Sequence, residues 1–218
     1  MSDLGELEFV KPADIEGRSF QIIAQELGER VLDPENELVV KRVIHASADF
    51  DYTDNLVFSP HATRIGVEAL RGGCSVVTDT SMAAAGINKR VLGRFGGRVH
   101  TYIGDPDVAA EAKERGLTRS AVCMERAAAL GKPLVYAVGN APTALVRLYE
   151  MLRDGSMACP PALIIGVPVG FVNVVESKEL ICGLDTPHIV ARGRKGGSNV
   201  AAAIVNALLY QASDNARE

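Results

Sequence analysis

Short apolar runs alternate with helical patterns from about residue 70 onward. The runs that predict strands are Cys74–Thr78, Arg98–Ile103, Leu134–Val138, Ala162–Gly166 and His188–Ala191. Segments with apolar residues at helical spacing separate or follow them, namely Asp105–Gly116, Thr118–Leu130, Pro142–Leu152, Phe171–Cys182 and Gly197–Tyr210. This alternation predicts a three-layer α/β/α fold, with a mainly parallel sheet of about five strands between two layers of helices.

Two more helical patterns precede the strands. One predicted helix covers Ile15–Leu27 behind Asp14 as its cap, and the second runs from residue 34 or 35 to about Ser47. Apolar residues of the first helix, such as Ile22, Ile23 and Leu27, form a stripe that a single small sheet has little area to cover, so we expect a homodimer interface at the N-terminal helices. Without repeats or a linker-like change of composition, residues 1–218 are predicted to form one domain.

Composition narrows the class of protein. Of the 218 residues, 47% are hydrophobic and 23% are charged, which excludes a disordered chain. The apolar stretch Ala162–Val175 is short and interrupted by glycine and proline, so it is not expected to cross a membrane. A net charge of -4 without a long basic run argues against nucleic acid as a partner. The acidic start is unlike a secretion signal, so we expect a cytoplasmic protein.

Cysteine spacing and motif searches argue against several kinds of site. The four cysteines lie far apart in apolar or small-residue surroundings, which predicts buried free thiols and no structural metal site. The chain lacks the dinucleotide-binding, P-loop, serine-elbow and zinc-peptidase motifs. We therefore expect no bound cofactor.

Glycine-rich segments follow three of the predicted strands, at Gly139–Thr143, Gly166–Phe171 and Gly193–Asn199. Glycine lets the backbone approach a ligand closely and exposes N–H groups at a helix start. Each segment alone is explained equally well as a tight turn before a helix. Three of them in one chain favour a ligand-lined rim at the carboxyl ends of the strands.

His45 is the histidine with the most suggestive neighbours. Arg42 and Lys41 precede it by three and four residues, so all three can share one helix face. Two nearby cations lower the pKa of an imidazole and repel its protonated form. Such a cluster is favourable when a polyanion docks on this helix face and offsets the positive charge. A solvated amphipathic surface helix explains the pattern about equally well. His100 and His188 lie inside apolar strand runs and are interpreted as core residues.

Five segments in a fixed order resemble the precorrin-8X methylmutase (cobalt-precorrin-8 methylmutase) family of vitamin B12 biosynthesis. They span nearly the whole chain and are Arg42–Phe50, Asp79–Asn88, Gly139–Leu145, Gly166–Lys178 and Arg192–Ser198. The resemblance implies an isomerase that moves a methyl group from C11 to C12 of a corrin-type ring, giving hydrogenobyrinate or cobyrinate. It also implies a homodimer with an α/β core and sites near the subunit interface.

The resemblance also implies roles for individual residues. His45 matches the family histidine, Ser19 and Arg42 match substrate-binding positions, and Arg119 resembles a further substrate-contacting arginine. A 1,5-sigmatropic methyl shift requires a rigidly held ring and a well-placed proton, so His45 is the candidate general acid. Carboxylates of the substrate would raise the pKa of His45 and bind the nearby cations.

Two other functions stay open at this level. The first is a corrinoid-binding or carrier protein without catalysis, and the second is an α/β enzyme acting on a small phosphorylated or carboxylated metabolite. Within this family, Gly86–Arg90 resembles members that act on the cobalt-containing ring, which favours that substrate, and Asn88 and Lys89 could meet one of its carboxylates. Asn88 is equally suited to capping the next helix.

Overall fold

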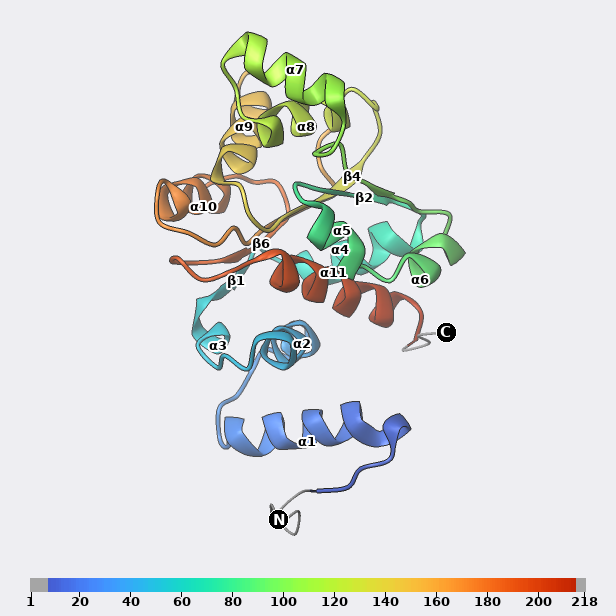
Figure 1. Ribbon diagram of the computed structural model, residues 1–218. Coiled ribbons are helices and arrows are strands. Elements are labelled where there is room, and N and C mark those ends of the chain that lie inside the picture. Colours follow the sequence, from blue (N-terminus) through green and yellow to red (C-terminus); the bar gives the residue numbers. More distant parts are fainter. Residues whose placement is uncertain (1–7, 215–218) are drawn as a thin grey trace, which may run out of the picture.

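A six-stranded sheet forms the centre of the computed structural model, which describes residues 8–214 (Figure 1). Its strand order is β1-β6-β5-β4-β2-β3, and neighbouring strands are parallel except that β1 runs antiparallel to β6. The strands are β1 (Leu56–Phe58), β2 (Ser75–Thr78), β3 (Val99–His100), β4 (Leu134–Val138), β5 (Leu163–Gly166) and β6 (His188–Ala191). The five parallel strands therefore end at one common edge.

Helices cover both faces of this sheet. Those of one layer, including the N-terminal helices, are α1 (Ile15–Leu27), α2 (Glu37–Ser47), α4 (Ala62–Arg71), α5 (Ser81–Gly86), α6 (Lys89–Arg94) and α11 (Ser198–Ala212). Those of the other layer are α7 (Pro106–Arg115), α8 (Arg119–Ala128), α9 (Pro142–Arg153) and α10 (Val174–Cys182). A short 3-10 helix (Pro12–Asp14) precedes α1, and a single helical turn, α3 (Tyr52–Asn55), precedes β1.

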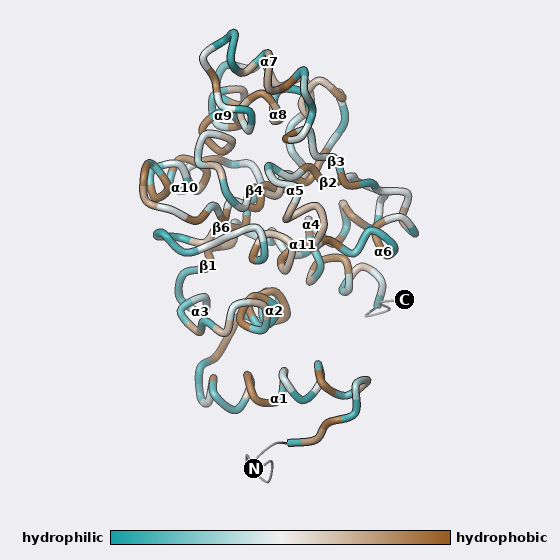
Figure 2. Tube along the Cα trace, viewed as in Figure 1, coloured by the Kyte–Doolittle hydropathy of each residue, from teal (hydrophilic) through white to brown (hydrophobic). Residues whose placement is uncertain are grey.

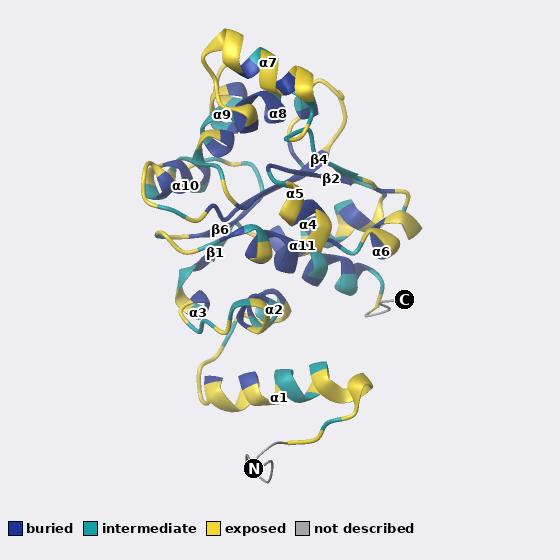
Figure 3. Cartoon of the chain, viewed as in Figure 1, coloured by how far each residue is buried: buried dark blue, intermediate teal, exposed yellow. Residues whose placement is uncertain are grey.

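Side chains that point alternately to the two faces of the sheet divide the interior into two cores. In β4, Leu134, Tyr136 and Val138 face the core beneath α7 to α10, whereas Val135 and Ala137 face the core beneath α2, α4 and α11. Successive strand residues point to opposite faces, and a parallel sheet covered on both sides buries them all. Figure 3 shows the central strands as buried along their length.

α11 is the central helix of its layer. Ten of its 15 residues are buried, because it packs on the sheet and is itself covered by α2. α1 is the outermost element and packs mainly on α2 (Figure 1). Apolar and polar residues alternate along α1 (Figure 2), yet only Ile23 and Leu27 are buried. Among the described residues, no helix is long and apolar enough to span a membrane.

The three-layer α/β fold and its mainly parallel sheet confirm the sequence-based prediction. β1 was missed, since three residues on an antiparallel edge leave too short a pattern to recognise. The strand predicted at Arg98–Ile103 was too long, because only two of its residues pair with β2. Asp14 is the N-cap residue of α1, as predicted, but its side chain accepts no capping hydrogen bond.

The cysteine and histidine predictions were partly correct. All four cysteines are free thiols, but only Cys123 is buried, and the other three are half-buried. His188 is a core residue whose Nδ1 lies 2.9 Å from the Thr186 carbonyl oxygen. His100 is only half-buried, because it lies on the short edge strand β3.

Candidate functional site

The point where the chain reverses its winding lies between β2 and β4. From β2 the chain crosses to β3 on one side through α5 and α6, then returns through α7 and α8 to β4 on the other side. Ligands of such sheets bind outside the carboxyl ends of the strands at this position. The carboxyl edge of β2, β4, β5 and β6 is called the rim below.

Asp79, the first residue after β2, organises the rim at this point. Its fully buried carboxylate accepts hydrogen bonds from the backbone N–H groups of Gly139 (2.9 Å), Asn140 (2.9 Å) and Ala141 (2.7 Å). Burial raises the pKa of Asp79, although the three N–H donors act in the opposite direction. This carboxylate fixes the turn between β4 and α9 and leaves Asn140 exposed at the rim.

Thr80 connects the rim to the start of α11. Its hydroxyl lies 2.8 Å from that of Ser198 and also accepts the N–H of Ala83, capping α5. Gly139 passes so close that a Cβ there would lie 2.7 Å from the Ser198 Cα. Glycine is therefore required where β4 meets α11.

Two of the predicted glycine-rich segments are bound to each other. The Gly197 N–H donates to the Val167 carbonyl at 2.9 Å, and the Gly170 N–H donates to the Arg194 carbonyl at 3.2 Å. Gly196 has a φ of +155°, and any Cβ there would collide with the Val167 carbonyl oxygen at 2.1 Å. The close approach confirms that these glycines belong to one rim.

Lys178 holds the same loop from below. Its fully buried ammonium group donates to the carbonyl oxygens of Gly193 (2.7 Å) and Lys195 (2.8 Å). Burial lowers the pKa of Lys178 to about 8. With both carbonyls turned inward, the Arg194 guanidinium lies outside, 5.5 Å from the centre of the exposed Phe171 ring.

His45 lies in the last turn of α2, near the rim. The Asn199 side-chain amide, in the first turn of α11, donates to the neighbouring Ala46 carbonyl at 3.5 Å. The His45 imidazole is exposed and stacks on the Phe20 ring, with centroids 5.5 Å apart and planes 19° apart. Partial burial lowers the pKa of His45, and the charge of Arg42 lowers it further.

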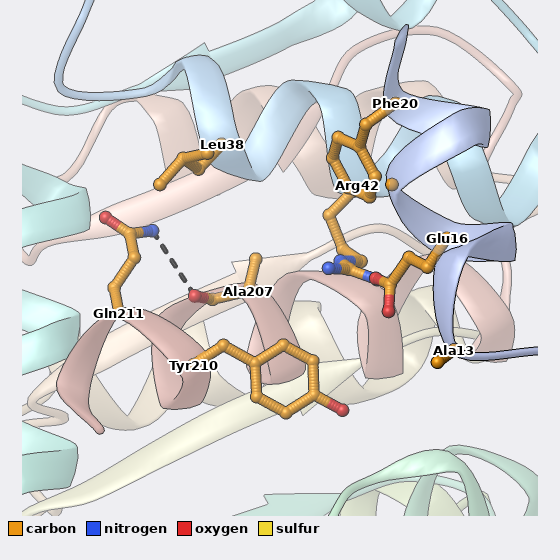
Figure 4. Close-up of a pocket in the computed structure, with 9 residues that line it drawn as sticks. Ala13, Glu16, Phe20, Leu38, Arg42, Ala207, Tyr210 and Gln211 are labelled. Carbon is orange, nitrogen blue, oxygen red and sulfur yellow. Dashed lines mark hydrogen bonds and ion pairs between the residues drawn. The ribbon is translucent and has the colours of Figure 1, made fainter. Parts of the chain in front are cut away.

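Arg42 lies one turn before His45 and is largely enclosed. Its guanidinium lies 4.7 Å from the centre of the Phe20 ring and 5.3 Å from that of Tyr210, and it forms an ion pair with Glu16. These residues line a cavity of about 300 Å³ between α1, α2 and α11 (Figure 4). The second cation predicted beside His45, Lys41, pairs instead with Glu37.

Ser19 is adjacent to Phe20 on α1, and its hydroxyl donates to the Ile15 carbonyl at 2.9 Å. Phe20 contacts both Arg42 and His45, so the structure brings two of the six predicted site residues together where α1 crosses α2, and Ser19 is next to Phe20 along α1. Phe20 itself was missed by the sequence analysis. Its contacts with His45 and Arg42 arise only because α1 crosses α2.

Arg119 lies in the other helical layer but at the same edge of the sheet. It begins α8, and the preceding Thr118 hydroxyl lies 2.7 Å from that of Thr143, in the first turn of α9. Because α9 starts just after β4, this contact places Arg119 near the rim, across the sheet from His45. Its exposed side chain makes one long hydrogen bond, 3.4 Å, to the Ile103 carbonyl.

Asn88 and Lys89 lie apart from the other predicted site residues. The Asn88 side chain accepts the Val91 N–H at 3.1 Å and so caps α6, as the alternative interpretation had it. Its backbone N–H donates to Asn206, about two turns along α11 from the rim. Lys89 is exposed.

Asp79, Thr80 and Lys178 also had no individual role in the sequence analysis. An aspartate directly after a buried apolar strand was the available signal for Asp79. Lys178 gave no comparable signal: it lies four residues after Val174 and three before Ile181, on the buried face of α10, but a lysine is rarely buried, so its residue type predicts a solvent-exposed side chain.

The winding of the sheet and the cations near its rim define an α/β protein with a candidate ligand site at the carboxyl ends of its strands. A family model described as precorrin-8X methylmutase matches residues 14–211. The chain belongs to the precorrin-8X methylmutase family, which consists of isomerases of cobalamin biosynthesis.

Curated relatives and a solved structure agree with this assignment. The cobalt-precorrin-8 methylmutase of Salmonella typhimurium is 48% identical over 206 residues, covering 92% of this chain and 95% of that protein. The precorrin-8X methylmutase of Pseudomonas aeruginosa is 42% identical, covering 88% and 91%. The crystal structure of precorrin-8X methylmutase from Thermus thermophilus superimposes with a TM-score of 0.84 at 38% identity, covering 92% and 98%.

Proposed function

We propose that this protein moves a methyl group from C11 to C12 of precorrin-8X or cobalt-precorrin-8, giving hydrogenobyrinate or cobyrinate, with His45 as the proton donor. The observation that carries the proposal is the contact of His45 and Arg42 with one ring, that of Phe20, near the rim of a methylmutase-family fold. The exposed imidazole is accessible to a ligand, and Arg42 supplies a cation one helical turn away.

The electrostatics of His45 suit a proton donor that becomes charged only when the ligand arrives. In the free protein, partial burial and Arg42 both lower its pKa, which favours the neutral imidazole. A substrate carrying several carboxylates reverses this balance, because negative charge near the ring raises the pKa. Substrate and product are isomers, so the required contribution is a held ring and a proton at the right position.

Arg42, Ser19 and Arg119 are proposed to bind carboxylates or edge groups of the ring. Arg119 lies on the other side of the sheet from His45, so a wide, flat ligand over the rim could contact both. Asn88 and Lys89 are proposed as a further contact, although the capping bond of Asn88 already uses its side-chain oxygen.

The decisive experiment follows the visible spectrum of the protein with precorrin-8X over time. We expect the unmodified protein to convert the chromophore to that of hydrogenobyrinate. His45→Ala should bind the ring but lose about 10²- to 10⁴-fold in rate. A carrier protein would shift the spectrum once without conversion, and an enzyme for small metabolites would leave it unchanged. Full turnover by His45→Ala would exclude the proton-donor role.

We also propose that the cobalt-containing ring is the natural substrate. Relatives from Salmonella typhimurium and Priestia megaterium, at 48% and 43% identity, bear the cobalt-precorrin-8 name, which supports this choice. Turnover of cobalt-loaded and metal-free substrate should be compared under anaerobic conditions. A clear preference for the metal-free ring would contradict this choice and leave the methylmutase assignment intact.

We propose a homodimer, although the apolar stripe of α1 gives it little support in the structure. Two residues of the predicted stripe, Ile23 and Leu27, are buried within the chain, whereas Ile22 stays 38% exposed. Support now comes from Phe171 and Val172, which are 79% and 78% exposed at the rim. Light scattering is expected to give twice 23.2 kDa, and a species of 23.2 kDa alone would contradict the dimer.

The four free cysteines agree with the proposed cytoplasmic location.

A further inference from the structure

The ion pair between Arg42 and Glu16 joins two helices that are otherwise loosely connected at this point. Glu16 lies in the first turn of α1, and Arg42 lies in the middle of α2. The buried residues of α1, Ile23 and Leu27, both belong to its second half. Its first half is therefore held to α2 by this pair and by the Phe20 ring rather than by a buried apolar seam.

The surroundings of Arg42 leave a ligand few directions of approach. The rings of Phe20 and Tyr210 lie 4.7 Å and 5.3 Å from the guanidinium carbon, and the Arg42 side chain is only 14% exposed. A carboxylate binds arginine best at the N–H edge of the guanidinium plane. Glu16 already places a carboxylate oxygen on Nη1 at this edge (Figure 4).

We propose that Glu16 is an internal competitor of the substrate: its carboxylate occupies Arg42 until a carboxylate of the corrin ring displaces it. This inference rests on the proposed function, in which Arg42 binds substrate. Displacement of Glu16 removes one of the two contacts that hold the first half of α1 to α2 and leaves the Phe20 ring as the other. The second half stays attached through its two buried residues. Glu16 therefore sets how much of the binding free energy the substrate must use to enter.

A competitor and a positioning residue predict opposite effects of the same substitution. Glu16→Gln keeps the size of the side chain but removes the charge, so a substrate carboxylate no longer has to replace another anion. The pair is partly exposed, so we expect the dissociation constant for hydrogenobyrinate, and KM, to fall about three- to tenfold. If Glu16 instead held Arg42 in place for the substrate, both constants would rise.

A matched control is available just before α1. Glu8 forms an ion pair with Arg18 at 2.6 Å, outside the cavity that Arg42 lines. Glu8→Gln removes the same charge from the same end of the protein, so any general effect of net charge on a polyanionic ligand appears in both variants. The quantity to compare is therefore the dissociation constant of Glu16→Gln relative to that of Glu8→Gln.

Hydrogen exchange of the free protein provides a second measurement that needs no ligand. Glu16→Gln should speed amide exchange in residues 15–22 relative to residues 23–27, because the ion pair with Arg42 is lost while Ile23 and Leu27 stay buried. Protection of residues 15–22 that is the same in Glu16→Gln and Glu8→Gln would overturn the competitor role. So would an unchanged or raised dissociation constant for Glu16→Gln relative to Glu8→Gln. Failure of the unmodified protein to bind the ring would instead overturn the proposed function together with this inference.

Discussion

The imidazole of His45 stacks on the ring of Phe20, with the two centroids 5.5 Å apart. The stacking partner comes from α1, whereas His45 belongs to α2, so the crossing of these helices partly buries the histidine. Since partial burial is the largest cause of its lowered pKa, the Phe20 ring is the group expected to control that pKa.

Replacing Phe20 with leucine should therefore raise the pKa of His45 toward 6.5, its ordinary value. The smaller side chain cannot cover the imidazole face, and water returns to the charged form. Titration of the His45 ring protons by NMR measures the shift. Phe95→Leu serves as the control, because Phe95 is half-buried at the end of α6. A His45 pKa that stays the same in Phe20→Leu would show that the ring does not cause the depression.

The same depression makes folding stability depend on pH. Well above pH 6.5, the ordinary pKa of histidine, His45 is neutral in both states, and its contribution to the free energy of unfolding is complete. As the pH falls through 6.5 toward the lower folded-state pKa, the unfolded chain binds more protons, and the protein loses stability. Denaturant unfolding at pH 7.5 and 5.5 should show a larger loss for the unmodified protein than for His45→Gln. Equal losses would contradict the lowered pKa.

Most of the fold, but only part of the candidate site, could be predicted from the sequence. Parallel strands such as β4 are recognisable because a sheet covered on both faces needs continuous apolar runs. Likewise, the spacing of Arg42 and His45 follows from helix periodicity alone. Phe20 and Asp79 contact residues that the sequence places far away, across a helix crossing and between strands β2 and β4. Such contacts depend on tertiary packing, which no local pattern encodes.

Asp79→Asn should destabilise the protein by about 1–3 kcal/mol. The aspartate accepts three backbone N–H groups with two oxygens, whereas an asparagine has one acceptor oxygen and leaves at least one buried N–H facing its own amide. Asp154→Asn is the control, because Asp154 accepts a single N–H, that of Ser156, at an exposed turn. Chemical denaturation of both variants tests the difference. Similar losses in the two would mean that the buried turn tolerates the missing acceptor.

Lys178 should make the protein more stable as the pH rises above about 8. Burial lowers its pKa from 10.5 in the unfolded chain to about 8 in the folded protein. Between these values the unfolded state binds more protons, so deprotonation of the folded lysine increases the free energy of unfolding by at most about 3 kcal/mol. Lys178→Met should lack this increase between pH 8 and 10.5. The test compares how the free energy of unfolding changes with pH in the unmodified protein and in Lys178→Met. Equal slopes in the two proteins would show that the pKa of Lys178 is not lowered in the folded state.

Arg119→Ala should weaken binding of hydrogenobyrinate about three- to tenfold and leave thermal stability almost unchanged. The side chain is exposed, with one long hydrogen bond at 3.4 Å, so it contributes little to folding and is available to a carboxylate. Arg153→Ala is the matched control, because Arg153 is an exposed arginine in the last turn of α9, which begins at the rim and ends away from it. Both variants remove one positive charge, so only a local contact distinguishes them.

Titration at two salt concentrations adds a second criterion, since a lost carboxylate contact also reduces the dependence of affinity on salt. Equal affinities for the two variants would place Arg119 outside the binding surface.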